Sequence, residues 1–344
     1  MATRHEALTF TPRTVARSEA ELLAGATDRR PMSHTDSKSG ARMERVVIDG
    51  DPYVAKWMSF DDDWTMRCIG DLGCKTLQLW EYGILDALPD CINQPIVGCA
   101  HDPGIGPGGK ETILLMRDIG AWTVPEGDQP IPLSQHLGFL DHMAQIQARF
   151  WDFEDLFGLT PMANRYMEAS PWMIETEVAL DSDAFIPPLM GRGWDLLPGL
   201  APTLAKIVMP LALDPSPLID AYGDTPTTLI HGNWKFGNLG TDDAGRTVLF
   251  DWEAPGAAPG CVEFAWYLCL NTARLPHSKE DAVRDYRAAL ERHGIDADGW
   301  FEHQLEVALL GAMVQFGWEK ALGGRGPELD WWAHRAVEGA RHLS

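Results

Sequence analysis

The sequence predicts an α+β protein of two lobes: a small β-rich lobe over residues 1–119 and a larger, mostly helical lobe over residues 120–344. Three observations support this prediction. β-rich runs dominate the first third of the chain, helical periodicity dominates the remainder, and two short β-like runs inside the helical part flank a polar loop. A chain of 344 residues is long enough for two lobes, each with its own core.

The N-terminal part begins with an amphipathic segment at 12–26, which predicts a short helix, followed by a polar, turn-rich stretch at 28–40. Two β-rich runs, 43–48 and 53–58, surround an Asp-Gly turn and predict a β-hairpin. Apolar residues then recur at helical spacing over 64–88.

A last strand is expected at 111–116, and after Gly120 the pattern becomes helical. The polar loop lies between the β-like runs 228–230 and 247–250. The helices expected in this second lobe cover 133–150, 161–178, 279–293, 299–322 and 328–342.

Composition excludes some classes of partner. The net charge of −22, from 28 basic and 50 acidic residues, disfavours nucleic acid and anionic membranes, which bind basic surfaces. It is compatible with a cationic substrate, but a generally acidic proteome gives the same value. No secretion signal or membrane-spanning run is evident, so a cytoplasmic protein is expected. The six cysteines form no CxxC pair and are expected to be free thiols.

The most informative segment runs from His231 to Asn238 (His-Gly-Asn-Trp-Lys-Phe-Gly-Asn) and is followed 13 residues later by Asp251. Asp251 ends an apolar run and precedes Trp-Glu. One amide oxygen and one carboxylate from neighbouring segments suit Mg²⁺, which takes a few hard oxygen ligands and otherwise keeps water and phosphate oxygens. We therefore expect Asn238 and Asp251 to be metal ligands.

This motif resembles that of the aminoglycoside phosphotransferase-like kinases, which read His-Gly-Asp, four residues, Asn, then a strand and Asp. The resemblance is specific over about residues 230–270 and holds at the level of pattern over about 42–344. It implies a two-lobe protein-kinase-like fold, ATP and Mg²⁺ as cofactors, and transfer of a phosphoryl group to a hydroxyl. The family's catalytic Asp falls on Asn233 in this chain.

The resemblance assigns nucleotide contacts in the first lobe. Lys56, on the predicted strand Tyr-Val-Ala-Lys, matches the lysine that meets the α- and β-phosphates. Glu81, on the following helix, is the preferred acid to hold that lysine, with Asp71 and Asp86 as alternatives. The stretch 36–40 is a candidate phosphate-covering loop, although a plain turn fits it equally well.

The segment after the last strand of the first lobe resembles the hinge that reads adenine through backbone groups. The matching positions are the carbonyl of Arg117 and the N–H of Ile119. In the second lobe, Lys235 follows the base position by two residues and is expected to stabilise the transferred phosphoryl group. We expect His231 and Glu263 to have structural roles around the loop.

Asn233 raises the question of activity, since an amide cannot accept a proton from a hydroxyl and a general base is worth about 10²- to 10⁴-fold in rate. Three explanations are open: an engineered substitution, a natural enzyme of low activity, or a nucleotide-binding pseudokinase. If turnover persists, it needs another base, such as Glu253 or an amine of the substrate.

The prediction is therefore an ATP-dependent kinase acting on a hydroxyl of an aminoglycoside, amino sugar or amino alcohol, with a catalytically weak or inactive pseudokinase as the rival. Protein-kinase activity is disfavoured, because no activation-segment motif follows Asp251. Indole faces with carboxylates suit a cationic or sugar-like acceptor, although core packing explains tryptophans equally well. The residues proposed to line the acceptor site are Trp252, Glu253, Gln315, Trp318, Glu319, Trp331 and Trp332.

Overall fold

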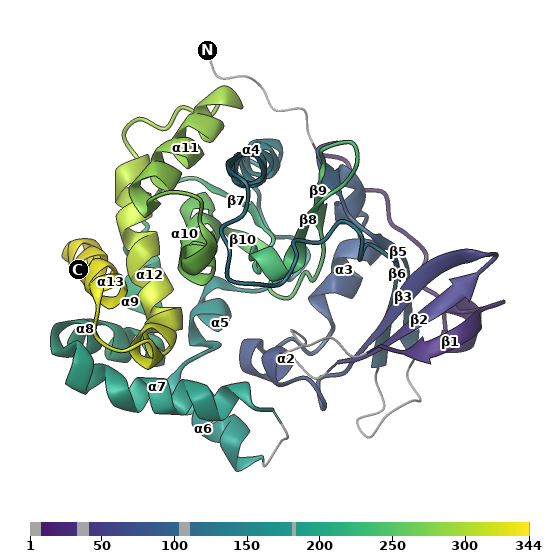
Figure 1. The fold of residues 1–344 in the computed structure, drawn as a ribbon, viewed down its shortest axis with the longest axis horizontal. Coiled ribbons are helices and arrows are strands. Elements are labelled where there is room, and N and C mark those ends of the chain that lie inside the picture. Colours follow the sequence, from purple (N-terminus) through teal and green to yellow (C-terminus); the bar gives the residue numbers. More distant parts are fainter. Residues whose placement is uncertain (1–7, 33–40, 103–110, 181–183, 344) are drawn as a thin grey trace.

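A computed structural model describes residues 8–32, 41–102, 111–180 and 184–343. The candidate phosphate loop at 36–40 lies outside these ranges. The five-stranded sheet and most of the helices occupy opposite sides of the molecule, with α2 and α3 between them (Figure 1). The predicted α+β class and its order, strands first and helices after, are confirmed.

The N-terminal sheet is antiparallel with strand order β1-β2-β3-β6-β5. The predicted hairpin is confirmed: Ile48 pairs with Asp51 across a two-residue loop. Both loop residues, Asp49 and Gly50, have positive φ angles, which fits the mirror-image turn that matches the twist of a hairpin. The strands are β1 Thr27–Pro31, β2 Arg42–Ile48, β3 Asp51–Met58, β5 Ile96–Asp102 and β6 Glu111–Arg117.

Two sequence predictions in this lobe are wrong. The helix expected over 12–26 shrinks to α1, Glu19–Leu22, which has no buried residue to hold a longer helix against the sheet. Residues 28–31 of the stretch expected to be turns belong to the exposed edge strand β1, Thr27–Pro31. The segment 64–88 divides into α2 Trp64–Ile69, α3 Lys75–Glu81 and the 3₁₀ turn η1 Ile84–Ala87.

The C-terminal lobe is helical around α12, whose 22 residues are mostly buried. The sequence does not predict four of its helices, α7, α8, α9 and α10. Two of them, α7 and α8, contain prolines, which are typical of helix breaks in a sequence. The helices are α4 Leu133–Arg149, α5 Met162–Met167, α6 Pro171–Ala179, α7 Ile186–Leu200, α8 Pro202–Leu213, α9 Ser216–Asp220, α10 Gly260–Asn271, α11 Lys279–Arg292, α12 Phe301–Leu322 and α13 Pro327–Gly339, with 3₁₀ turns η2 Phe236–Asn238, η3 Thr272–Arg274 and η4 Ala340–His342.

Two small sheets fix the polar loop within this helical lobe. Strand β7, Thr227–Ile230, enters the loop and pairs with β10, Gly256–Pro259. Strand β8, Leu239–Thr241, leaves the loop and pairs with β9, Thr247–Leu249. Strand β4, Ile92–Asn93, comes from the first third of the chain and pairs parallel with β9. The loop is therefore held by both halves of the molecule.

The core is continuous across the two halves, since one buried apolar cluster includes Trp64 and Leu79 as well as Phe264 and Trp332. A smaller cluster, which includes Val46, Trp57 and Ile113, is confined to the N-terminal sheet. Within the described ranges, no helix is both long enough and apolar enough to cross a membrane. All six cysteines are free, as predicted.

Candidate active site

The imidazole of His231 organises the loop between β7 and β8. It lies fully inside the protein, and burial lowers its pKa to about 3, so the ring is neutral. Nε2 donates to the carbonyl of Phe250 at 3.0 Å, and Nδ1 accepts from the backbone N–H of Asn233 at 3.1 Å. One uncharged ring thus ties Asn233 to the strand that leads into Asp251, which is the structural role predicted for His231.

Two buried charges brace the start of the same loop. The carboxylate of Glu263, on the first turn of α10, accepts from the backbone N–H groups of His231 and Gly232. The guanidinium of Arg165, on α5, donates to the carbonyl of Gly232 at 2.9 Å. Gly232 has a φ of +86°, and a Cβ there would meet the carbonyl oxygen of Ala254 at 2.0 Å. The bracing role predicted for Glu263 agrees with these contacts.

Asn238 and Asp251 are brought to neighbouring positions, because the N–H of Phe250 points to the carbonyl of Asn238 at 3.4 Å. The side-chain nitrogen of Asn238 donates to the carbonyl of Asn233 at 3.0 Å, which turns its Oδ1 the other way. Asp251 is one of few non-glycine residues with positive φ, at 64°. Such strain is typical of functional sites, and the amide and carboxylate oxygens fit the donor set that Mg²⁺ prefers.

Lys56 on β3 reaches across to this loop. Its Nζ lies 2.7 Å from Oδ1 of Asp251, and the two side chains are largely buried. Burial alone would lower the pKa of Lys56 and raise that of Asp251. Because the two opposite charges attract each other, the pKa of Lys56 is instead raised and that of Asp251 is lowered. The first lobe and the candidate metal site are therefore joined by one ion pair.

Glu81 does not lie beside Lys56, contrary to the sequence prediction. It is the last residue of α3 and is exposed, and its backbone carbonyl accepts from Arg13 on the outer surface. The two alternative acids do not pair with Lys56 either. Asp71 accepts from the N–H of Lys75 at the start of α3, and Asp86 pairs with Arg13. α3 meets the site through a different residue, Thr76, whose hydroxyl donates to the carbonyl of Trp252.

Asn233 is buried and faces Glu253. Its Nδ2 donates to Oε2 of Glu253 at 2.5 Å, while its Oδ1 has no hydrogen-bond partner among the described residues. Burial, together with the negative charge of Asp251, raises the pKa of Glu253. A carboxylate of increased basicity is thus hydrogen bonded to the side-chain amide of Asn233.

Lys235 is half-buried on the same loop, and its N–H donates to the carbonyl of Asn233 at 2.9 Å. Its positive charge contributes to lowering the pKa of Asp251 and opposes the upward shift at Glu253. The structure therefore brings together five of the predicted site residues: Asn233, Lys235, Asn238, Asp251 and Lys56.

The predicted hinge follows β6 and is half-buried. The backbone N–H of Arg117 bonds to Pro95, and its guanidinium bonds to the carbonyl of Gln94 at 2.7 Å, which fixes the end of the strand. In the described part of the chain, the N–H of Ile119 has no hydrogen-bond acceptor. Lys56 pairs with Leu114, three residues before Arg117, on the neighbouring strand.

No protein-family model and no curated protein matches the sequence. Solved structures match along most of the chain. The choline kinase LicA from Streptococcus pneumoniae aligns with a TM-score of 0.51 and 11% identity, covering 94% of this chain and 96% of that chain. A thermostable mutant of the aminoglycoside phosphotransferase APH(4)-Ia, in a ternary complex with ADP and hygromycin B, aligns with a TM-score of 0.50 and 16% identity, over 94% and 96% of the two chains. This chain has the fold of the aminoglycoside phosphotransferases and choline kinases.

Within this phosphotransferase fold, two acidic residues near the site were missed by sequence reasoning. Asp63 caps α2 and is buried, and its charge acts on Lys56 and Glu253. Glu168 follows α5, and burial and the charge of Glu253 raise its pKa to about 8. A capping signal in sequence marks Asp63 as the start of a helix, but no local pattern places either residue at the site.

The predicted acceptor-lining tryptophans mostly belong to the core of the phosphotransferase fold. Trp332 and Trp252 are fully buried. The backbone of Trp318, on α12, lies directly against Gly193 of α7. Gln315 is also buried and donates to the carbonyl of Arg165. Trp331 lies on α13 and bonds to Glu280 of α11. These five residues are therefore engaged in the packing and hydrogen bonds of the described chain, and their role in lining an acceptor site stays a prediction, as it does for Glu253 and Glu319.

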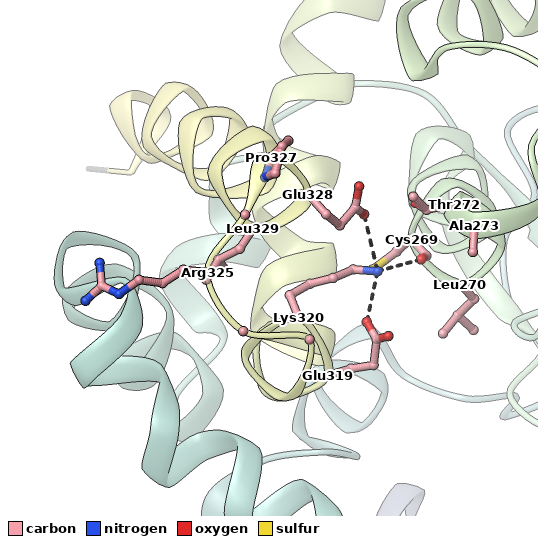
Figure 2. A pocket seen from close by; sticks show the side chains of 13 residues that line it. Cys269, Leu270, Thr272, Ala273, Glu319, Lys320, Arg325, Pro327, Glu328 and Leu329 are labelled. Carbon is pink, nitrogen blue, oxygen red and sulfur yellow. Dashed lines mark hydrogen bonds and ion pairs between the residues drawn. The ribbon is translucent and has the colours of Figure 1, made fainter.

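Glu319 lines a cavity of about 380 Å³ between the C-terminal ends of α10 and α12 and the start of α13 (Figure 2). The Lys320 ammonium projects into it and is held by Glu319, Glu328 and the carbonyl of Cys269. Two wall residues, Leu270 and Thr272, flank Asn271, whose Oδ1 accepts from the N–H of Phe236 in the loop between β7 and β8. The cavity and the loop thus share the end of α10.

Proposed function

We propose that this protein is an ATP-dependent phosphotransferase that acts on a hydroxyl of a small molecule. The observation that carries the proposal is the 2.7 Å ion pair between Lys56 and Asp251, formed beside the loop that holds Asn233, Lys235 and Asn238. A phosphate-binding lysine, two oxygen ligands for a metal and a second lysine near the reacting position are the groups that phosphoryl transfer requires.

In this proposal Asn238 Oδ1 and the Asp251 carboxylate hold Mg²⁺, which when bound neutralises phosphate charge. Lys56 exchanges Asp251 for the α- and β-phosphate oxygens when the nucleotide enters. Ile119 N–H and Arg117 C=O bind the adenine edge. Lys235 faces the group in transfer, where its charge offsets the negative charge that accumulates on the equatorial oxygens.

Glu253 is proposed to take the proton of the acceptor hydroxyl in place of the family's Asp. Asn233 holds the Glu253 carboxylate through its Nδ2 and offers its unpartnered Oδ1 to orient the hydroxyl. Because burial raises the pKa of Glu253, its carboxylate is a stronger base than one in water. The acceptor's oxygen attacks the γ-phosphorus, the bond to the β-phosphate oxygen breaks, and ADP leaves.

The acceptor is proposed to be an amino alcohol, amino sugar or aminoglycoside seated against the end of α10. The cavity of about 380 Å³ is lined by Glu319 and Glu328, whose carboxylates pair with Lys320 in the free protein, so the ammonium of an acceptor would compete with that lysine. Asp63 and Glu253 add carboxylates near the reacting position, where Glu168 retains its proton at neutral pH because its pKa is raised to about 8. Such surroundings favour a cationic acceptor, since its ammonium offsets carboxylates that are otherwise desolvated.

The test measures ADP release from Mg-ATP with a panel of amino alcohols, amino sugars and aminoglycosides. It compares the wild type with Glu253→Gln and Asn233→Asp. Gln keeps an oxygen that accepts from Asn233 Nδ2 but cannot take a proton, so kcat should fall about 10²- to 10⁴-fold at an unchanged Mg-ATP affinity. Glu338→Gln, a change at the C-terminal end of α13 outside the cavity lining, serves as the control and should retain wild-type kcat.

Acceptor-dependent turnover by the wild type that is lost in Glu253→Gln supports the proposal. Turnover confined to Asn233→Asp identifies instead a kinase fold whose base has been removed. If both proteins bind Mg-ATP and neither turns over any acceptor, the rival function, a nucleotide-binding pseudokinase, is favoured. Asn233 is the specific observation behind that rival, because it removes the usual proton acceptor.

A further inference from the structure

Three metal-binding side chains converge away from the nucleotide site, where α4 meets the start of α11. His136 comes from α4, His277 from the segment between η3 and α11, and Asp285 from α11. The Nε2 atoms of the two histidines are 3.0 Å apart, and His277 Nε2 is 3.2 Å from Oδ2 of Asp285. All three donor atoms lie within 4.8 Å of one another.

The ring of His136 is oriented by a partner behind it. Its Nδ1 lies 2.6 Å from the hydroxyl of Tyr267, and both residues are fully buried. Nδ1 is therefore engaged with the Tyr267 hydroxyl, and Nε2 is left to face His277 and Asp285. Histidines that bind metals are commonly held in this way by a hydrogen bond to the other ring nitrogen.

The two imidazoles lie in hydrogen-bond contact, with Nε2 atoms 3.0 Å apart, ring centroids 4.7 Å apart and ring planes inclined by 84°. One Nε2 therefore donates its proton to the other when no cation is present. A cation bound by both nitrogens would replace that proton. Two nitrogens about 2.1 Å from a tetrahedral ion are separated by roughly 3.4 Å, so the two rings need to part by only a few tenths of an ångström to admit it.

The carboxylate supplies an independent observation. Oδ2 of Asp285 is a buried atom with no hydrogen-bond donor among the described residues, since the nearby His277 nitrogen does not approach it with hydrogen-bond geometry. A buried carboxylate oxygen without a donor is costly. A cation bound by the same two imidazoles would satisfy it.

We propose that His136, His277 and Asp285 form a binding site for a divalent transition metal ion, with Zn²⁺ the best fit. Two imidazoles and one carboxylate favour Zn²⁺ and similar ions over Mg²⁺, which prefers oxygen ligands. His277 and Asp285 are partly exposed, so water can complete the coordination. The ion would fasten α11 to α4 beside Tyr267, whose ring contacts Phe236 of the catalytic loop at a centroid distance of 5.6 Å.

The test is calorimetric titration of chelator-treated, full-length protein with Zn²⁺, in a reducing buffer with excess Mg²⁺ and no nucleotide. The wild type should bind one Zn²⁺ per chain. His277→Ala and the isosteric Asp285→Asn should each weaken this binding by roughly 100-fold or more, since each removes a ligand. Co²⁺ should give d–d absorption in the wild type that is lost in both variants.

His293→Ala is the matched control. His293 follows the end of α11, pairs with a carboxylate of α4 (Asp141, 3.0 Å) and is about as buried as His277, but among the described residues it belongs to no group of three metal-binding side chains. It should bind Zn²⁺ like the wild type. Absence of Zn²⁺ binding in the wild type, or equal binding in folded His277→Ala and Asp285→Asn, would overturn the proposal and leave an ordinary histidine–aspartate ion pair.

Discussion

Gly232→Ala is expected to disrupt the catalytic loop through a clash with backbone. The residue has φ +86°, and an added Cβ would meet the carbonyl oxygen of Ala254 at 2.0 Å, its carbon at 2.4 Å and the guanidinium of Arg165 at 2.9 Å. The two nearest atoms belong to backbone and cannot rotate away. The loop must therefore move relative to Asp251, three residues before Ala254.

The expected loss of stability has two parts. A non-glycine residue in the left-handed region costs about 1–2 kcal/mol, and overpacking a dense interior adds typically 1–3 kcal/mol. The sum is a decrease of roughly 2–5 kcal/mol in the free energy of unfolding. Gly245→Ala separates the two parts, because Gly245 has φ +78° with no atom within 4 Å of an added Cβ. Gly245→Ala should therefore lose only the ~1–2 kcal/mol that the left-handed conformation costs.

Urea unfolding of the two variants measures these values, and calorimetry with Mg-ATP measures the effect on the site. Gly232→Ala should lose more stability than Gly245→Ala and should bind Mg-ATP at least tenfold more weakly, whereas Gly245→Ala should bind like the wild type. Equal stability losses in the two variants, or unchanged nucleotide affinity in Gly232→Ala, would refute the proposed close packing of the loop.

Three further predictions follow from buried charges. Glu263→Ala leaves two backbone N–H groups unpaired and should lower the free energy of unfolding by roughly 2–5 kcal/mol in urea titrations. Lys56→Met removes the ammonium beside Asp251 and should weaken Mg-ATP binding roughly 10- to 100-fold by calorimetry. The pKa of Glu168 is raised to about 8, so the folded state retains a proton that the unfolded state releases above about pH 4.3. This contribution to stability is present at low pH and is lost as pH rises towards 8, so Glu168→Gln should flatten the pH dependence of Tm, and an unchanged profile would contradict it.

Features set by local chemistry could be predicted from the sequence. The hairpin of β2 and β3 follows from an Asp-Gly turn between β-rich runs, and its register agrees. The loop from His231 to Asn238 and the following Asp251 are predictable because their spacing along the sequence matches a metal-ligand pattern. Their meeting with Lys56 agrees with the order of strands in the first lobe.

Features set by tertiary packing could not be predicted. Its place on a helix favours Glu81 as the partner of Lys56, but the rotation of α3 exposes Glu81 and directs Thr76 to the site instead. Helix α7 is not predicted because Pro198 is typical of a helix break, although tertiary packing keeps it inside the last turn, where it removes one i→i−4 hydrogen bond. Glu168 comes to the site only through the packing of α5, about which its neighbours in sequence say nothing.

The central claim is that this fold retains a working magnesium–nucleotide site around Asp251. Calorimetric titration with ATP, in the presence of Mg²⁺ and then of chelator, tests it most directly because no acceptor is needed. The wild type should bind one ATP per chain in a Mg²⁺-dependent manner, and Asp251→Asn should lose most of that dependence. Absence of ATP binding by the folded wild type, or binding that ignores both Mg²⁺ and the Asp251→Asn change, would contradict the claim.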